Sequence, residues 1–470
     1  MATHEQDSQS EEQLQGTTSQ QQAQLPPATP VYVLRGHGAP IHALCFFGQN
    51  SKLASGDADG WIVIWSVVTK RPIAVWKAHE GAVLEVKGFF FEQPTGEVQI
   101  FTHGRDHKLR LWSFKAQDEE ILDKTLPVDL NKKPAMGAKA QPWLHHSLSV
   151  NALNFCAFSL CFIPISPEQG DTDGSGNQAA LTTSKSPLLL AVPNALDSGG
   201  IDIFHLPSER RVCTIPSDRK TQTGMLMAVN LFISPASGDL YIASGYEDGH
   251  VMVHARRGPL RLEDAEDSSV WKWEKLYENR PHTQPVLSLD VPPTKEYFLT
   301  SSADAVLAKH PIPELTPHPH ISSSALEENP IKTVNTKHAG QQGLRVRSDG
   351  KIFATAGWDC RVRVYACKNM KEMAVLKWHK EGCYAVAFAE VFDADRPSEP
   401  QRAPTEGNTG ISPRQAEDND DKGDDDRSLV QTRPIGSLAA IHQQRNQKAQ
   451  RTHWLAAGAK DGKISLWDIY

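Results

Sequence analysis

Short apolar stretches recur along the chain, and polar turns separate them. One such stretch precedes the turn at 55–60, and another, Trp-Ile-Val-Ile-Trp at 61–65, follows it. Residues 457–467 show a similar turn followed by an apolar stretch. Runs of β-branched and aromatic residues bounded by Gly, Asp and Ser are typical of β-strands joined by tight turns. The pattern therefore predicts a chain built from repeated strand–turn–strand units.

A fixed spacing relates these units to one another. A hydroxyl residue lies four positions before an aspartate, which lies six positions before a large aromatic residue, as in Ser55, Asp59 and Trp65. The further copies are Thr102/Asp106/Trp112, Asn194/Ser198/Phe204, Ser244/Asp248/His254, Thr300/Asp304/His310, Thr355/Asp359/Tyr365 and Ala457/Asp461/Trp467. An apolar stretch precedes each turn, Val150–Phe158 in the third copy. Most units then run into a histidine, namely His37, His79, His146, His282, His338 and His379.

Four strands in a unit of about 40–45 residues are the signature of WD repeats. A lone four-stranded sheet leaves its faces and edges open, whereas a radial arrangement covers the faces. We therefore predict an all-β fold, a seven-bladed WD40 β-propeller over residues 30–470. The last unit ends after its third strand, while residues 31–34 resemble a strand that has no blade of its own. This N-terminal strand is predicted to complete the last blade and close the ring.

Two segments differ from the repeats. Residues 1–29 form a Gln- and Ser-rich tail, and residues 391–452 interrupt the last blade. Within the second segment, residues 417–427 carry seven acids and two bases, a net charge of −5 against −7 for the whole chain. Both segments are predicted to be disordered. The acidic insertion is either a solvated loop or a docking segment for a basic partner such as a histone tail.

Charge and composition narrow the class of protein. A net charge of −7 gives no general attraction to nucleic acid or to an anionic membrane. No apolar run approaches the roughly 20 residues needed to cross a bilayer, and the N-terminal residues lack the features of a signal peptide. Seven cysteines without paired spacing favour a reducing compartment, the cytosol or the nucleus.

In WD repeats, which these units resemble, a loop His, a turn Asp, a strand Ser or Thr and a strand Trp form a hydrogen-bonded chain. An indole N–H only donates, so a hydroxyl oxygen is a suitable acceptor for it. The first two blades have every member of this network, whereas blades three to five do not. The candidate network residues are His37, Ser55, Asp59, Trp65, His79, Thr102, Asp106, Trp112, His338, Thr355, Asp359, His379, Asp461 and Trp467.

The recurring His and Asp pairs favour a structural role over a catalytic one. Catalysis needs one unique constellation in one cleft, and these pairs repeat around the ring. His310, His318 and His320 lie in Pro-rich sequence without a Cys or carboxylate at zinc-like spacing. We therefore predict that the protein is not an enzyme and that it uses no cofactor and no metal.

Several motifs carry a sharper resemblance. They are Leu34-Arg-Gly-His37, Ser55-Gly-Asp-Ala-Asp-Gly-Trp61, Arg71-Pro-Ile-Ala-Val-Trp-Lys-Ala-His79, Thr102–Trp112 and Val150–Phe158. Together they resemble the fungal ASTRA-associated protein 1 family and, more distantly, an animal G-protein-β-like WD protein. The resemblance implies a non-catalytic scaffold or adaptor subunit of the ASTRA complex, a nuclear assembly linked to chromatin remodelling and to maturation of phosphatidylinositol-3-kinase-related kinases.

The resemblance also implies the partners. They are a kinase-like scaffold protein, RuvB-like ATPases and kinase-maturation cofactors, with no direct nucleic acid and no membrane. The expected location is the nucleus, with the cytoplasm as a second one. The alternative function is a substrate receptor of a ubiquitin ligase, which needs a second docking element that the sequence does not contain, or another generic protein-interaction platform.

Overall fold

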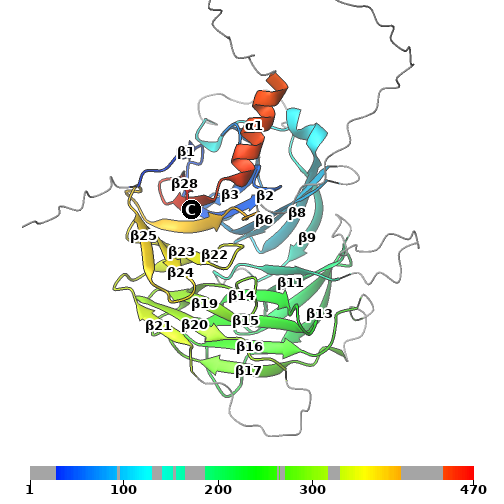
Figure 1. Ribbon diagram of the computed structural model, residues 1–470. Coiled ribbons are helices and arrows are strands. Elements are labelled where there is room, and N and C mark those ends of the chain that lie inside the picture. The colour runs from blue at the N-terminus through cyan, green and yellow to red at the C-terminus, as the bar shows by residue number, and fades with distance from the viewer. Residues whose placement is uncertain are drawn as a thin grey trace, which may run out of the picture.

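The computed structural model describes residues 28–92, 96–129, 140–151, 155–164, 186–261, 264, 270–315, 329–392 and 438–469. The described chain forms seven antiparallel four-stranded sheets, which we call blades 1 to 7 (Figure 1). This arrangement confirms the predicted seven-bladed β-propeller. No described helix combines the length and the apolar character needed to span a bilayer.

Blades 1 to 4 each use four consecutive strands. Blade 1 has β2 (Ile41–Phe47), β3 (Lys52–Asp57), β4 (Trp61–Ser66) and β5 (Pro72–Lys77). Blade 2 has β6 (Val83–Phe91), β7 (Glu97–Gly104), β8 (Lys108–Lys115) and β9 (Trp143–Ser149), with the 3-10 helices η1 (Ala116–Glu120) and η2 (Pro127–Asp129) before β9. Blade 3 has β10 (Ser159–Phe162), β11 (Leu188–Pro193), β12 (Ile201–Leu206) and β13 (Arg210–Ile215). Blade 4 has β14 (Leu226–Ile233), β15 (Leu240–Tyr246), β16 (Val251–Arg256) and β17 (Glu274–Asn279).

The remaining blades complete the ring. Blade 5 has β18 (Val286–Asp290), β19 (Tyr297–Ser302), β20 (Val306–Pro311) and β21 (Lys332–Asn335). Blade 6 has β22 (Gln341–Val346), β23 (Ile352–Gly357), β24 (Val362–Ala366) and β25 (Glu372–Leu376). Blade 7 has β26 (Cys383–Phe388), β27 (Trp454–Ala459), β28 (Lys463–Asp468) and β1 (Tyr32–Arg35).

Blade 7 is assembled from both terminal regions of the chain. Strand β1 pairs antiparallel with β28, and Leu34 stands opposite Ile464. Leu34 is buried, so the pairing joins an apolar contact to the backbone hydrogen bonds. The predicted closure by an N-terminal strand is confirmed, with the strand displaced by one residue from the expected 31–34.

The apolar core lies between the blades. Ile62 and Ile64 of blade 1 share one buried cluster with Val86 and Ile100 of blade 2. A cluster of the same kind joins blades 6 and 7. Each fully buried aliphatic side chain contributes about 1.5–3 kcal/mol relative to exposure, so the contacts between neighbouring blades hold the ring together.

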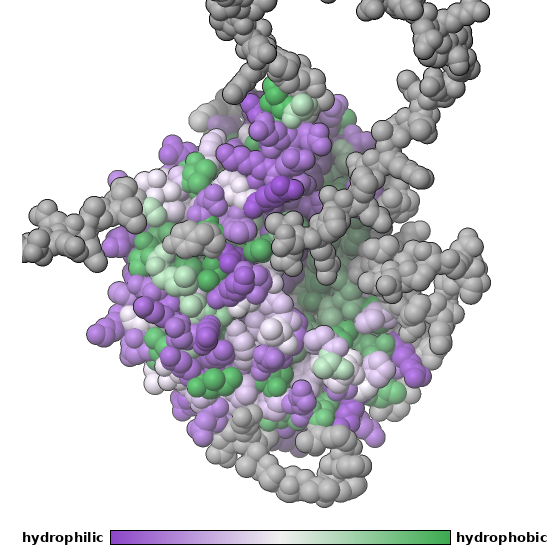
Figure 2. All heavy atoms as spheres, viewed as in Figure 1, coloured by the Kyte–Doolittle hydropathy of each residue, from purple (hydrophilic) through white to green (hydrophobic). Residues whose placement is uncertain are grey.

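A helix stands inside the segment for which disorder was predicted. Helix α1 (Leu438–Arg451) precedes β27, and Figure 2 shows hydrophilic side chains over the part of it in view. Its sequence contains no Gly or Pro and is rich in Ala, Gln and cations, which are good helix formers. Asn50 donates to the Gln450 carbonyl over 2.9 Å, and Trp454 donates to the Ala449 carbonyl over 2.8 Å. The prediction of disorder for 391–452 therefore fails at 438–451, while residues 1–27 and 393–437 lie outside the described residues.

Blade 3 begins later than the sequence predicts. The expected first strand was Val150–Phe158, but β10 starts at Ser159 and pairs with β11 so that Ser159 stands opposite Ala191. Val150 and Phe158 are buried, whereas Phe155 between them is 59% exposed. Cys156 is also buried, so the apolar residues of this stretch contribute to the core although the described residues 155–158 form no strand.

Candidate functional site

The structure joins four side chains of blade 2 in one polar network. His79, in the loop after β5, lies 2.9 Å from Asp106 through Nδ1 and 2.8 Å from the Thr102 hydroxyl through Nε2. Trp112 donates its indole N–H to the same hydroxyl over 3.0 Å. The network ties a loop, a turn and two neighbouring strands together, which is a structural task.

Asp106 is held in its charged form. Burial acts to raise its pKa, but hydrogen bonds from His79 and Arg110 outweigh burial and lower the pKa well below the ordinary value. Arg110 donates to the carboxylate over 2.7 Å. Because the folded-state pKa is depressed, this carboxylate stabilises the protein above the ordinary aspartate pKa, and the contribution disappears as the pH falls through the folded-state value.

In blade 1 the structure replaces one expected residue. His37 lies 2.7 Å from both Asp57 and the Ser55 hydroxyl, and Trp65 donates to Ser55 over 2.8 Å. The spacing had predicted Asp59, but that residue is exposed, and its backbone N–H donates to the Asp57 carboxylate over 3.0 Å. Position 57 corresponds to Gly104 of blade 2, so in blade 1 the carboxylate reaches the histidine from the end of β3.

Blade 5 contains a network that the sequence prediction treated as incomplete. His282 lies 2.8 Å from the Thr300 hydroxyl and 3.2 Å from Asp304. His310 takes the place of the tryptophan, 3.0 Å from Thr300, and its other nitrogen lies 2.8 Å from the Tyr277 hydroxyl. Burial lowers the pKa of His310 well below its ordinary value. A neutral imidazole can donate as an indole does and also accept, so it fits this position.

Blade 6 keeps the hydroxyl but changes its partner. The Thr355 hydroxyl donates to the Gln341 side chain over 2.6 Å, whereas the expected partner, His338, is half-exposed and 3.7 Å from Asp359. Arg363 makes two hydrogen bonds to Asp359, 2.6 and 3.1 Å long. The predicted contact of His338 with Thr355 is therefore wrong, because the fully buried Gln341 occupies that space.

Blade 7 uses a hydroxyl that the spacing did not identify. Ser465 lies 2.7 Å from His379 Nε2 and accepts from Trp467 over 2.8 Å. Asp461, the expected carboxylate, bonds to Lys463 over 2.6 Å. Ala457 has no hydroxyl at the expected position, so a Ser two residues before the Trp is the signal that could have revealed the substitution.

Blades 3 and 4 have different polar contacts. Asn194 donates to Asp202 over 2.8 Å in blade 3, and Ser244 donates to Tyr246 over 3.2 Å in blade 4. His146, expected in the loop before blade 3, lies within β9 and contacts Glu209. The described part of the chain contains no group of three His, Cys, Asp or Glu side chains placed to hold a metal ion. The networks are thus best understood as structural connections between strands.

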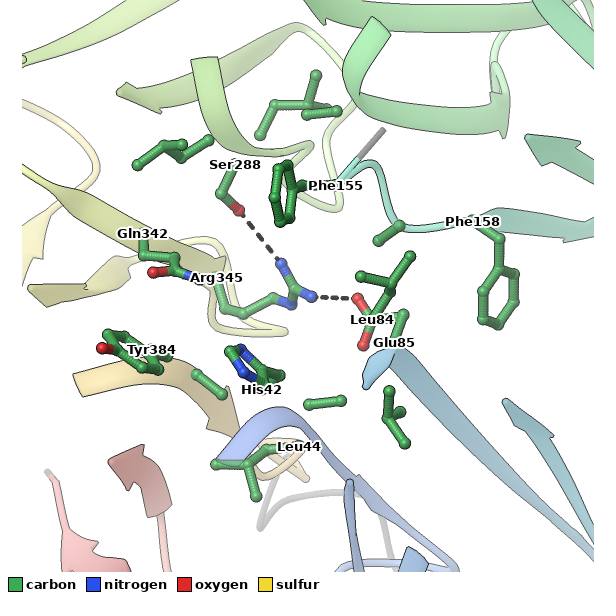
Figure 3. A pocket seen from close by; sticks show the side chains of 18 of the residues that line it. His42, Leu44, Leu84, Glu85, Phe155, Phe158, Ser288, Gln342, Arg345 and Tyr384 are labelled. Atoms are coloured by element: carbon green, nitrogen blue, oxygen red, sulfur yellow. Dashed lines mark hydrogen bonds and ion pairs between the residues drawn. The ribbon is translucent and has the colours of Figure 1, made fainter. Parts of the chain in front are cut away.

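The first strands of the blades surround a central cavity of about 310 Å³ (Figure 3). Two charged side chains meet across it, since Arg345 of β22 bonds to Glu85 of β6 over 2.5 Å. Arg345 also donates to its own neighbour's carbonyl, that of Leu344, over 2.9 Å. Opposite charges from non-adjacent blades therefore pair inside the ring.

Taken together, the ring and its repeated networks define a WD-type β-propeller. A model of the ASTRA-associated protein 1 family matches residues 30–467. The chain belongs to this family. It is 60% identical over 455 residues to the ASTRA-associated protein 1 of Aspergillus niger. The aligned region covers 96% of this chain and 99% of the relative.

Other relatives extend the similarity across fungi. The ASTRA-associated protein 1 of Penicillium rubens is 57% identical over 94% of this chain and 98% of the relative. That of Schizosaccharomyces japonicus is 31% identical over 77% of this chain and 93% of the relative. The similarity therefore covers most of the length of both near and distant relatives.

Proposed function

We propose that this protein is a non-catalytic scaffold or adaptor subunit of the ASTRA complex. The observation that carries the proposal is the 60% identity, over nearly the whole chain, to a relative named for its association with ASTRA. A propeller presents loops from seven blades on one rigid frame, which suits a platform that holds several proteins at once.

The proposed partners are a kinase-like scaffold protein, RuvB-like ATPases and the cofactors that mature phosphatidylinositol-3-kinase-related kinases. The proposed setting is the nucleus, in connection with chromatin remodelling. These assignments rest on the family resemblance. A fluorescent fusion that is excluded from nuclei would contradict the location.

The test is affinity purification of the tagged protein from a fungal extract, with the co-purifying proteins quantified by mass spectrometry. We expect the kinase-like scaffold, the RuvB-like ATPases and the maturation cofactors to be enriched together. A variant lacking residues 32–35, in which the ring cannot close, serves as the control and should lose them. Recovery of a cullin-based ligase instead would overturn the proposal in favour of a substrate receptor.

A further inference from the structure

One end of the central cavity exposes large aromatic side chains. We call this region the channel mouth, and it comprises His42, Arg105, Phe155, Gln342, Trp358 and Tyr384. Phe155 is 59% exposed and Trp358 is 47% exposed. Aromatic residues that are left open around a cavity are typical of surfaces that bind another molecule.

The channel mouth is a continuous surface. The Trp358 ring packs directly over Gly340, where an added Cβ would lie 2.2 Å from the ring. The Trp358 indole donates to the Gln342 side chain over 2.7 Å. Next to it, the rings of His42 and Tyr384 stack with centroids 5.4 Å apart and planes at 10° (Figure 3). These contacts fix the aromatic residues in place, which lowers the entropy cost of binding a ligand.

The mouth also carries the positive charge of Arg105. The Arg105 guanidinium lies over the Phe155 ring, 4.5 Å from its centroid, and has no carboxylate partner among the described residues. Among the described residues that line the cavity, the carboxylates are Glu85 and Asp290, and both are already engaged. Glu85 pairs with Arg345, and Asp290 accepts two backbone N–H groups at 2.8 and 2.9 Å.

We infer that the channel mouth docks a short segment of a partner protein in which a carboxylate adjoins a large apolar side chain. The Arg105 guanidinium binds the carboxylate, because none of the described carboxylates pairs with it. Phe155 and Trp358 supply the apolar contact area. Nucleic acid fits less well, because it demands several phosphate contacts and the chain has a net charge of −7.

The test uses the purified full chain against a displayed library of random peptides. We expect selection of peptides with Asp or Glu beside Trp, Phe or Leu. A fluorescein-labelled selected peptide should then bind at least about tenfold more weakly to Arg105→Glu and to Phe155→Ala, as expected when a central contact is removed. Trp143→Ala is the matched control, because Trp143 is 73% exposed on β9, the outermost strand of blade 2, and it should bind as wild type does.

Selection of no peptide, selection of peptides without acids, or displacement of the peptide by single-stranded RNA would each overturn the inference. Melting temperatures of all three variants should match the wild type, since the altered side chains are accessible. The inference rests on the proposed scaffold role, but the two can fail separately. A chain that recovers ASTRA subunits yet selects no acidic-apolar peptide keeps the scaffold role and loses the docking site.

Discussion

Blades 2 and 7 make the same connection with different side chains. In each, a loop histidine and an indole N–H share one hydroxyl oxygen. The hydroxyl belongs to Thr102 on the second strand of blade 2, but to Ser465 on the third strand of blade 7. Ser465 stands directly opposite Ala457, the residue that occupies the usual hydroxyl position. The shared acceptor is thus preserved although its strand has changed.

The two blades differ in how they treat the other histidine nitrogen. His79 Nδ1 lies 2.9 Å from Asp106, whereas the buried Nδ1 of His379 has no hydrogen-bond partner among the residues that the structure describes. The corresponding carboxylate, Asp461, bonds to Lys463 instead. Blades 2 and 7 therefore share the hydroxyl between His and Trp, while the contact between the histidine and a carboxylate is present in blade 2 and is replaced in blade 7.

The largest effect should come from deleting residues 32–35. Blade 7 depends on a strand from the other end of the chain, whereas blade 2 is continuous in sequence. Removing β1 exposes the edge of β28 and removes the buried Leu34, so we expect the free energy of unfolding to fall by at least about 3 kcal/mol. Urea unfolding measures this, and deletion of residues 8–11 is the length control. An unchanged midpoint would exclude closure by β1.

The second largest effect distinguishes carboxylates that belong to a hydrogen-bonded network from those that lie outside it. Asp106→Ala should lower the free energy of unfolding by about 1–3 kcal/mol, because it leaves buried donors without an acceptor. Asp461→Ala should stay within about 0.5 kcal/mol, as for a substitution outside the network. The same contrast is expected in blade 1 between Asp57→Ala and Asp59→Ala. Chemical denaturation of the four variants gives the values, and equal losses within either pair would contradict the assignment.

A smaller effect tests the exchanged hydroxyl. Ser465→Ala should cost about 1–2 kcal/mol, since it removes the acceptor shared by His379 and Trp467. Adding Ala457→Ser to that variant restores a hydroxyl at the position used in blades 1 and 2, and should recover roughly 0.5–1 kcal/mol. Thermal melting measures both steps. Ala456→Ser is the control on the same strand, and an equal recovery there would show that the position of the hydroxyl is irrelevant.

The smallest effect at neutral pH concerns protonation. Burial lowers the pKa of His379 to about 4 from 6.5. Between these values the unfolded chain binds a proton that the folded protein does not, so stability falls as the pH drops below 6.5. His379→Gln should flatten this dependence by at most about 1.4 kcal/mol per pH unit. Urea midpoints from pH 4 to pH 7 test it against His442→Gln, an exposed histidine on α1, which should change nothing.

The repeats and the ring closure were predictable because both rest on local patterns. Each blade needs apolar strands around a tight turn, and these recur at a fixed spacing. Residues 31–34 had the character of a strand but belonged to no repeat. The last repeat lacked a fourth strand, so these residues could be assigned to it. Position counting was less reliable for polar partners. The fixed spacing pointed to Asp59 and not to Asp57, because a distance along the sequence does not show which of the two carboxylates faces His37.

The other features that the sequence analysis missed depend on contacts between strands, or lie in segments whose average composition concealed them. Ser465 reaches the blade 7 network through its pairing with Ala457, which no spacing within one strand can indicate. In blade 6, Gln341 takes the role predicted for His338 as the partner of the Thr355 hydroxyl, and a search for histidines could not reveal it. Helix α1 was missed because the acidic and Pro-rich residues before it dominate the composition of 391–452. Phe155 lies within a stretch that the sequence analysis interpreted as a buried strand, so its exposure at the channel mouth was not predicted.

The pairing of Leu34 with Ile464 has a consequence for synthesis. The two residues are 430 positions apart, and a ribosome adds on the order of 5–20 residues per second. Strand β1 therefore waits roughly 20–90 s before the ribosome has added the strand with which it pairs. Throughout that time both edges of the unfinished ring are open to other chains. A truncated product that lacks residues 463–468 never closes them, so closure of the ring has to wait until β28 has been translated.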